Sequence, residues 1–395
     1  MNTSTKAIHT KFHRKDAYDA LQIPVYNALA YEFDDAAYMS DVFCGKVIVP
    51  DYSRVLNPTV MHLEEIVMNL TGAKEVSAFN SGMAAISAML LCVGGAGKNI
   101  VTSRHLFGNT YLFITKTLKR FGVEARLIDL TDIQQVKDSI DENTCCVFLE
   151  SVTNPQMEVA DISEISKITK EKRIPLIVDT TIIPFTQFDG NKLGIDFQVV
   201  SSTKYISGGA TSLGGLIIDY GYYPEISTLI KKDAVFNLGG YMSPQPAYLQ
   251  VLGLETLQVR YERQADSAKI IAKKLQDIPD VKSVGYPGLE NHKFNETFRK
   301  LYGERAGAMI TFDLKDKETC YKFINSLNLI HRATNLFDNR SLAIHPSSTI
   351  FGPLTDEEKQ KMDVKDTTIR LSIGLEDPDD IFSDLVQAIL KANEQ

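Results

Sequence analysis

The feature that most limits the fold is a regular alternation of short apolar segments and longer helical segments between about residue 70 and residue 220. The apolar segments have the length and composition of buried strands, and the segments between them have helical periodicity. Such alternation predicts an α/β fold of βαβ units, with a mostly parallel sheet covered by helices on both faces. The predicted strands are VSAFN (76–80), NIVTS (99–103), EARLID (124–129), CCVFLES (145–151), PLIVDT (175–180), FQVVSS (197–202) and GGLIID (214–219), and the predicted helices are 81–93, 110–122 and 162–173.

The chain has 395 residues, which exceeds what one hydrophobic core usually organises. A long amphipathic stretch at 247–276 ends the strand rhythm, so we place a domain boundary near residue 245. We predict an N-terminal arm (1–50), a large α/β domain (51–245) and a smaller C-terminal α+β domain (246–395). The last of these has strand-like segments at 305–316, 328–333 and 341–346 and a terminal helix at 377–393.

Composition favours a small-molecule partner. The net charge is −8 and no basic or basic-aromatic run is present, which argues against a nucleic-acid partner. No segment has the apolar length of a signal peptide or a membrane span, so we expect a cytoplasmic protein without a membrane partner. The five cysteines lack metal-type spacing, and we expect them to be reduced core residues. No His, Cys or carboxylate set has ligand spacing, so we expect no metal, and we interpret His105 and His345 as ordinary hydrogen-bonding residues.

Two charged side chains follow neighbouring predicted strands. Lys204 comes just after FQVVSS, and Asp179 ends LIVD. Most lysines lie on solvated surfaces, and a strand-end aspartate is more often a turn former than a functional group. However, the carboxyl ends of parallel strands are where open α/β sheets bind ligands. If the cofactor is pyridoxal phosphate, an amine and a carboxylate have defined tasks there: the lysine forms a Schiff base and the aspartate pairs with the ring nitrogen.

A third element at this edge is a strand that runs into Ser81, Gly82 and Met83 and then into an alanine-rich helix. Exposed amides at such a helix start can bind phosphate, although the joint alone is weak evidence. The segment is neither a Walker loop nor a dinucleotide fingerprint.

Ordered sequence blocks extend over nearly the whole chain. They are YSRVLNPT (52–59), SGMAAI (81–86), HLFGNTY (105–111), ESVTNPQMEVADI (150–162), VDTT (178–181), SSTKYISGG (201–209), SPQPAYLQVLGLETLQVR (243–260) and RLSIGLEDPDDI (370–381). In these blocks the chain resembles the fold-type I, pyridoxal phosphate-dependent enzymes of cysteine and methionine metabolism. SGGATSLGG and GLETL are most similar to the O-acetylhomoserine sulfhydrylase branch.

The resemblance implies a role for each matching residue. Lys204 would carry the cofactor and move protons, Asp179 would pair with the ring nitrogen, and Asn154 would bind the phenolic oxygen. A phosphate site would comprise the amides of Gly82 and Met83 and the hydroxyls of Ser201 and Thr203, completed by Tyr52 and Arg54 from a neighbouring subunit. Arg370, Ser341 and Asn154 would hold the substrate carboxylate. The resemblance thus implies a site shared across a dimer, in an assembly expected to be a homotetramer.

Three positions depart from the family pattern. Phe107 stands where most members have a tyrosine that stacks on the cofactor, so stacking survives without the hydroxyl. Lys204, or Tyr52 of the neighbouring subunit, would then move the protons, and we expect Lys204, Phe107 and Tyr52 to form the catalytic set. Asn109 stands where many methionine γ-lyases have cysteine, and VDTT replaces the commoner VDNT.

The resemblance implies γ-replacement on O-acetyl-L-homoserine by sulfide or methanethiol, giving homocysteine or methionine plus acetate. The alternative is a γ-lyase that acts on methionine, cystathionine or homocysteine and releases a 2-oxo acid and ammonia. A non-catalytic phosphate-binding module is a third hypothesis, which the joint presence of Lys204, Asp179, Asn154 and Arg370 disfavours.

Overall fold

The computed structural model of the chain describes residues 2–12, 16 and 18–394. Its larger sheet has seven strands in the order β1-β7-β6-β5-β4-β2-β3. Strands β2 to β6 run parallel, and β7 is antiparallel to both of its neighbours. The predicted mostly parallel α/β sheet is therefore confirmed. The strands are β1 (Glu75–Phe79), β2 (Asn99–Ser103), β3 (Glu124–Ile128), β4 (Thr144–Glu150), β5 (Leu176–Asp179), β6 (Phe197–Val200) and β7 (Gly215–Asp219).

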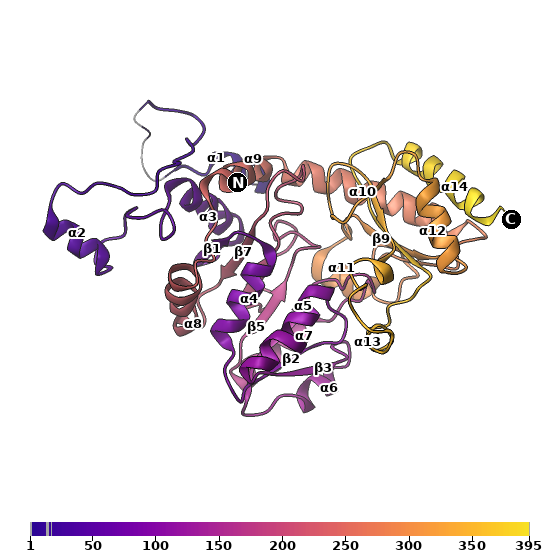
Figure 1. Cartoon of the computed structure of the whole chain (residues 1–395), viewed down its shortest axis with the longest axis horizontal. Coiled ribbons are helices and arrows are strands. Elements are labelled where there is room, and N and C mark those ends of the chain that lie inside the picture. The colour runs from indigo at the N-terminus through magenta and orange to yellow at the C-terminus, as the bar shows by residue number, and fades with distance from the viewer. Residues whose placement is uncertain (1, 13–15, 17, 395) are drawn as a thin grey trace.

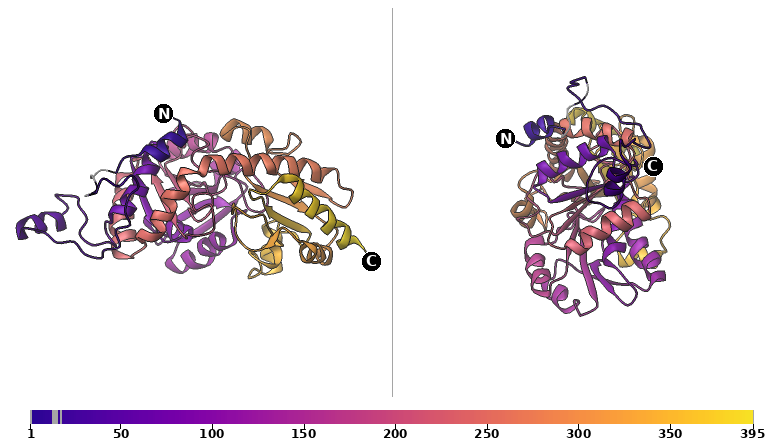
Figure 2. Two further views of the ribbon diagram at one scale, coloured as in Figure 1. Left: turned by 90° about the horizontal axis from the view of Figure 1, so that it is seen from above. Right: turned by 90° about the vertical axis from the view of Figure 1, so that its left-hand side faces the viewer.

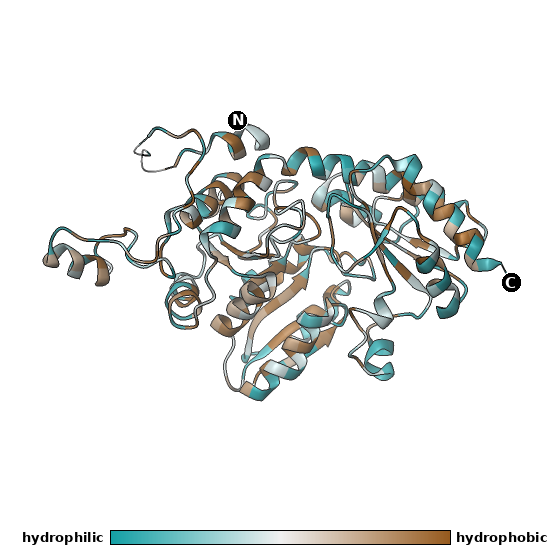
Figure 3. Cartoon of the chain, turned by 45° about the horizontal axis from the view of Figure 1, so that its top comes forward, coloured by the Kyte–Doolittle hydropathy of each residue, from teal (hydrophilic) through white to brown (hydrophobic). Residues whose placement is uncertain are grey.

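Helices cover both faces of this sheet (Figure 1). Successive side chains of a strand point to opposite faces, so in β4 Val147 and Leu149 join one apolar core while Cys146 and Phe148 join the other. One core contains side chains of α3 (Pro58–Thr71) and α7 (Ile162–Lys172), and the other contains side chains of α4 (Gly82–Val93). Figure 3 shows the result as brown strands between helices that are brown on one side and teal on the other. The shorter helical segments of this half are α5 (Gly108–Leu112), η1 (Phe113–Thr117), η2 (Leu118–Phe121), α6 (Ile133–Asp138), α8 (Pro224–Leu229) and η3 (Ile230–Asn237).

A second sheet lies in the C-terminal part, with the order β10-β11-β12-β9-β8. Its strands are β8 (Ser283–Gly285), β9 (Met309–Asp313), β10 (His331–Arg332), β11 (Leu342–Ile344) and β12 (Thr368–Ser372). In Figure 2 the two sheets lie side by side along the long axis of the molecule, joined by the long helix α10 (Leu257–Gln276). The predicted helix at 247–276 is divided at Thr256, because α9 (Pro244–Glu255) ends there. The other elements of this part are α11 (Asn295–Tyr302), α12 (Lys317–Ser326), η4 (Pro346–Ser348), α13 (Asp356–Lys361) and α14 (Pro378–Asn393).

The N-terminal segment carries two short helices, α1 (Thr3–His9) and α2 (Ala36–Phe43). Helix α2 stands away from the rest of the chain at the far left of Figure 1. Its C-cap residue, Cys44, is exposed, so the expectation that all five cysteines are core residues is wrong for this one. Among the described residues, no helix combines the length and the apolarity needed to cross a membrane. The residue limits proposed for the arm and the two domains stay a prediction.

Candidate active site

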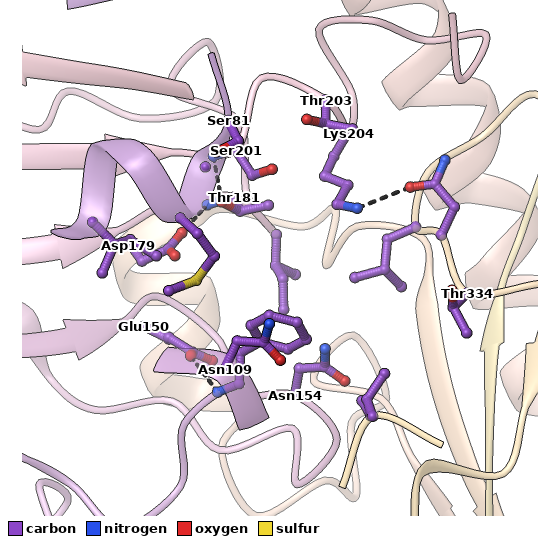
Figure 4. Close-up of a pocket in the computed structure, with 18 of the residues that line it drawn as sticks. Ser81, Asn109, Glu150, Asn154, Asp179, Thr181, Ser201, Thr203, Lys204 and Thr334 are labelled. Carbon is purple, nitrogen blue, oxygen red and sulfur yellow. Dashed lines mark hydrogen bonds between the residues drawn. The ribbon is translucent and has the colours of Figure 1, made fainter. Parts of the chain in front are cut away.

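A cavity of about 330 Å³ lies at the carboxyl ends of β4, β5 and β6. Its walls come from both halves of the chain, because Thr334, Asn335, Leu336, Ile350 and Arg370 close the side opposite the large sheet. Figure 4 shows Lys204 entering from one side while Asn109 and Asn154 lie across the cavity from it. The cavity brings together nine of the residues predicted from the sequence: Gly82, Met83, Phe107, Asn154, Asp179, Ser201, Thr203, Lys204 and Arg370.

Two carboxyl groups end adjacent strands at the floor of the cavity. Glu150 and Asp179 are direct partners in the register of β4 and β5, so their side chains lie side by side. Burial raises the pKa of both carboxyls, and for Glu150 the neighbouring Asp179 raises it further. The Asp179 carboxylate accepts a hydrogen bond from the Thr181 amide at 2.9 Å. A buried carboxyl of this kind becomes a stable anion when a cation binds beside it.

The N-terminus of helix α4 faces the same cavity. Ser81 caps α4 by accepting from the amide of Ala84 at 3.1 Å, which leaves the amides of Gly82 and Met83 without a partner inside the helix. A Cβ atom on Gly82 would meet Cβ of Ser201 at 2.6 Å, so glycine is required for this close approach. The exposed amides and the adjacent Ser201 hydroxyl give the cavity an anion-binding corner.

Lys204 is the only amine that lines the cavity within the described ranges. Its Nζ donates to Oδ1 of Asn335 at 2.9 Å. Burial, and then the positive charge of Arg370, lower the pKa of Lys204 to about 8. At neutral pH about a tenth of this amine is therefore in the neutral, nucleophilic form, far more than for an exposed lysine.

Arg370, on β12, is 3% exposed. Its Nη1 donates to Oδ1 of Asn154 at 3.4 Å and its Nη2 to the carbonyl oxygen of Asn335 at 3.2 Å. Its buried Nε has no hydrogen-bond partner among the described residues. Burial lowers the pKa of Arg370 to about 9, which still keeps the guanidinium charged at neutral pH. An unpaired donor on a buried cation fits a carboxylate ligand.

Phe107 is held in the wall of the cavity by its backbone, since its amide donates to Oε1 of Glu150 at 2.6 Å. Asn109 follows at the start of α5 and is exposed. Sequence reasoning missed Glu150, Thr181 and Asn335, although Glu150 and Thr181 lie inside the quoted blocks. The departure at VDTT has a structural partner: the buried Thr180 hydroxyl donates to the side chain of Gln198 at 2.9 Å.

Three predicted site residues do not line this cavity. Tyr52 and Arg54 lie in a separate recess, where Arg54 donates to the carbonyl oxygen of Phe236. Ser341 is fully buried, and its hydroxyl donates to Glu376 at 3.0 Å and accepts from the Gly374 amide at 2.9 Å. The chain by itself therefore does not bring these three side chains to Lys204.

A family model described as "Cys/Met metabolism PLP-dependent enzyme" matches residues 4–390. The chain belongs to this family. An L-methionine gamma-lyase of Fusobacterium nucleatum is 34% identical over 391 residues, covering 98% of each chain. An O-acetyl-L-homoserine sulfhydrylase of Corynebacterium glutamicum is 31% identical over 415 residues, covering 96% of this chain and 95% of that protein. Among the solved structures, a putative O-acetylhomoserine (thiol)-lyase of Campylobacter jejuni has a TM-score of 0.95 at 34% identity and covers 99% of this chain and 100% of its own.

The C. jejuni structure contains a pyridoxyl-lysine monophosphate. The chain, as a member of this family, is likewise a pyridoxal phosphate-dependent enzyme of the γ-elimination and γ-replacement type. The cavity fits such a group by its own chemistry. It contains one amine of lowered pKa, two buried carboxyls without a cationic partner among the described residues, an unpaired anion-binding helix start and an aromatic ring.

Proposed function

We propose that the enzyme catalyses γ-replacement on O-acetyl-L-homoserine with sulfide or methanethiol, giving homocysteine or methionine plus acetate. When bound, pyridoxal phosphate supplies an electron sink for the charge left on the substrate Cα. The chain would bind the cofactor through Lys204 covalently, through Asp179 at the ring nitrogen and through Asn154 at the phenolic oxygen. Gly82, Met83, Ser201 and Thr203 would hold its phosphate, and Phe107 would stack on its ring.

The proton transfers are assigned to Lys204. Phe107 has no ionisable group, while the Lys204 amine can accept a proton near neutral pH because its pKa is about 8. Arg370 would bind the substrate carboxylate with its free Nε, together with the Asn154 amide, and Ser341 would support that subsite from outside the cavity. Tyr52 and Arg54 would serve the phosphate of a neighbouring subunit, which requires at least a dimer. A homotetramer and a cytoplasmic location remain predictions.

The choice of an acetyl ester as substrate rests on the number of cationic side chains that line the cavity. Among its described lining residues, Lys204 and Arg370 are the only cations, and both have assigned partners. A succinyl or phospho ester would bring an additional anion into a cavity that offers no third cation among its described lining residues and already contains the carboxyls of Glu150 and Asp179, at a large desolvation cost. An acetyl ester brings none. Six aliphatic side chains also line the cavity: Ile86, Val152, Ile182, Leu213, Leu336 and Ile350. Apolar side chains disfavour water, so they favour the entry of a small thiol over the entry of water.

The test incubates the purified full-length enzyme with O-acetyl-L-homoserine, with and without sulfide, and measures homocysteine, acetate and 2-oxobutyrate. Sulfide-dependent homocysteine that is lost in Lys204→Ala supports the proposal. O-succinyl-L-homoserine and O-phospho-L-homoserine are compared under the same conditions, and a kcat/KM for either that equals the acetyl value would contradict the charge argument.

A γ-lyase is the second candidate, favoured by the 34% identity to the L-methionine gamma-lyase of F. nucleatum. It predicts 2-oxobutyrate and ammonia as the main products without added thiol. The same incubation with L-methionine as substrate separates the two candidates.

A further inference from the structure

Asn335 accepts hydrogen bonds from both cationic side chains of the cavity, Lys204 and Arg370. Its side-chain Oδ1 accepts from Nζ of Lys204 at 2.9 Å, and its backbone carbonyl oxygen accepts from Nη2 of Arg370 at 3.2 Å. On its far side Nδ2 faces Oδ2 of Asp338 at 3.4 Å. A neutral amide therefore stands between two cations and presents an acceptor to each of them.

The segment around Asn335 is held against the lysine segment by a second contact. The ring of Phe337 stacks on that of Tyr205, the residue after Lys204, with 3.8 Å between centroids and 4° between planes. Phe337 has φ +58°, a conformation that a bulky residue adopts only when its surroundings fix it. The Phe337 amide donates to the Ser372 hydroxyl at 2.6 Å, and Gln264 donates to the Asp338 carbonyl oxygen at 2.7 Å. These contacts hold the backbone next to Asn335 against the segment that carries Lys204.

We propose that Asn335 is a positioning residue for Lys204, whose side-chain carbonyl holds the lysine amine in the cavity whenever that amine is not covalently bound. The assignment of a covalent partner to Lys204 rests on the proposed function, whereas the contact between Asn335 and the amine does not. In a reaction that releases and recaptures the lysine, this contact keeps Nζ within the cavity and aims one N–H away from the reacting atoms. Because the Lys204 side chain is already held in one orientation, less conformational entropy is lost when the amine reacts again.

The test uses the full chain freed of cofactor and measures the reactivity of the Lys204 amine toward trace acetic anhydride, by mass spectrometry of the peptide, over a pH series that brackets 8. Exposed Lys273 in the same digest is the reference for the reagent. The charged groups around Nζ are Arg370, Glu150 and Asp179, with Asp338 behind Asn335, and none of them is changed.

Two near-isosteric variants should move the titration midpoint of Lys204 in opposite directions. Asn335→Asp places a carboxylate at the acceptor position and should raise it by about one to three pH units. Asn335→Leu removes the acceptor and should lower it by about one pH unit. Asn109→Leu, in the same cavity but without a bond to Lys204 among the described contacts, should leave it in place.

Folding of each variant is checked by far-UV circular dichroism. If both Asn335 variants titrate like wild type, or shift in the same direction, the proposal is overturned, because a merely structural asparagine would not give opposite shifts. The outcome is independent of the proposed function: absence of a lysine-bound cofactor in the native enzyme would refute Schiff-base formation at Lys204 and leave the amine titration unaffected.

Discussion

Lys204→Met should stabilise the cofactor-free chain, because it removes a charge that the folded state desolvates. The pKa of Lys204 is lowered from 10.5 to about 8, chiefly by burial. At 1.36 kcal/mol per pH unit this difference corresponds to a cost of about 3 kcal/mol at neutral pH. Methionine has a similar length and no charge. After loss of the hydrogen bond to Asn335, which contributes about 1.5 kcal/mol, a net gain of about 1–2 kcal/mol remains.

The sign of the pH dependence follows from the lowered pKa. Below about pH 8 both the folded and the unfolded lysine are protonated, and the full cost is present. Between 8 and 10.5 the unfolded chain binds more protons than the folded one, so the stability of wild type rises with pH. The difference between Lys204→Met and wild type should therefore shrink by about 2 kcal/mol between pH 7 and about pH 9.5.

The assay is urea denaturation at fixed protein concentration, with the Lys167→Met chain as a control. Lys167 is an exposed lysine paired with Glu164, and its replacement should change the stability by less than about 0.5 kcal/mol. Equal stability of Lys204→Met and wild type at pH 7, or a difference that does not change with pH, would refute the burial argument.

Three further changes test two other residues of the site and one buried ion pair outside it. Gly82→Ala should weaken pyridoxal phosphate binding at least tenfold, measured by equilibrium dialysis, since its Cβ would meet Ser201 at 2.6 Å; Gly95→Ala, with no contact closer than 4.0 Å, should not. Asp179→Asn keeps the side-chain volume but loses the anion, so cofactor retention in the same assay should fall at least tenfold, and unchanged retention would contradict its pairing with the ring nitrogen. Burial lowers the pKa of His105, but its bonds to Glu158 and Asp363 outweigh burial and raise it overall, so the stability these bonds add is present below pH 6.5 and lost as pH rises through the folded pKa. In His105→Gln the urea midpoint should therefore change less with pH above pH 6.5 than in wild type. The same pH dependence in both chains would show that the bonds of His105 to Glu158 and Asp363 do not contribute to stability.

The sheet was predictable from the sequence because local composition and burial agree there. Every predicted strand of the large sheet matches an observed one within a few residues. Most of these strands are buried and therefore largely apolar, whereas the edge strand β3 is partly exposed. The helix predicted at 110–122 is instead a succession of α5, the π-helical η1 and the 3-10-helical η2. Over so few residues, the periodicity of apolar residues cannot distinguish these hydrogen-bonding patterns, since the 3-10 helix and the π-helix each differ from the α-helix by less than one residue per turn.

The site was predictable where its residues follow strands or helix starts or, like Arg370, lie in a family-like sequence block, and not where they lie in a loop of the C-terminal part. The position of Lys204, Asp179 and Gly82 at or after the end of apolar segments marked them as candidate site residues. Asn335 lies in a loop with no periodic signal, and long-range contacts such as the packing of Phe337 on Tyr205 bring it to the amine. Tyr52 and Arg54 lie in a recess apart from the cavity of their own chain, so their predicted role depends on a neighbouring subunit.

The two cations of the cavity also predict how substrate binding changes the base. Arg370 is the second cause of the lowered pKa of Lys204, after burial. A carboxylate bound at the free Nε of Arg370 compensates that positive charge, so the Lys204 amine should become more basic just when a substrate is in place. Labelling of Lys204 in the cofactor-free chain, repeated with saturating butyrate, should show a higher titration midpoint than without it. Arg370→Met should abolish the response to butyrate, because the carboxylate then has no partner. A midpoint that butyrate does not change in wild type would show that Arg370 and Lys204 are not electrostatically coupled through this site.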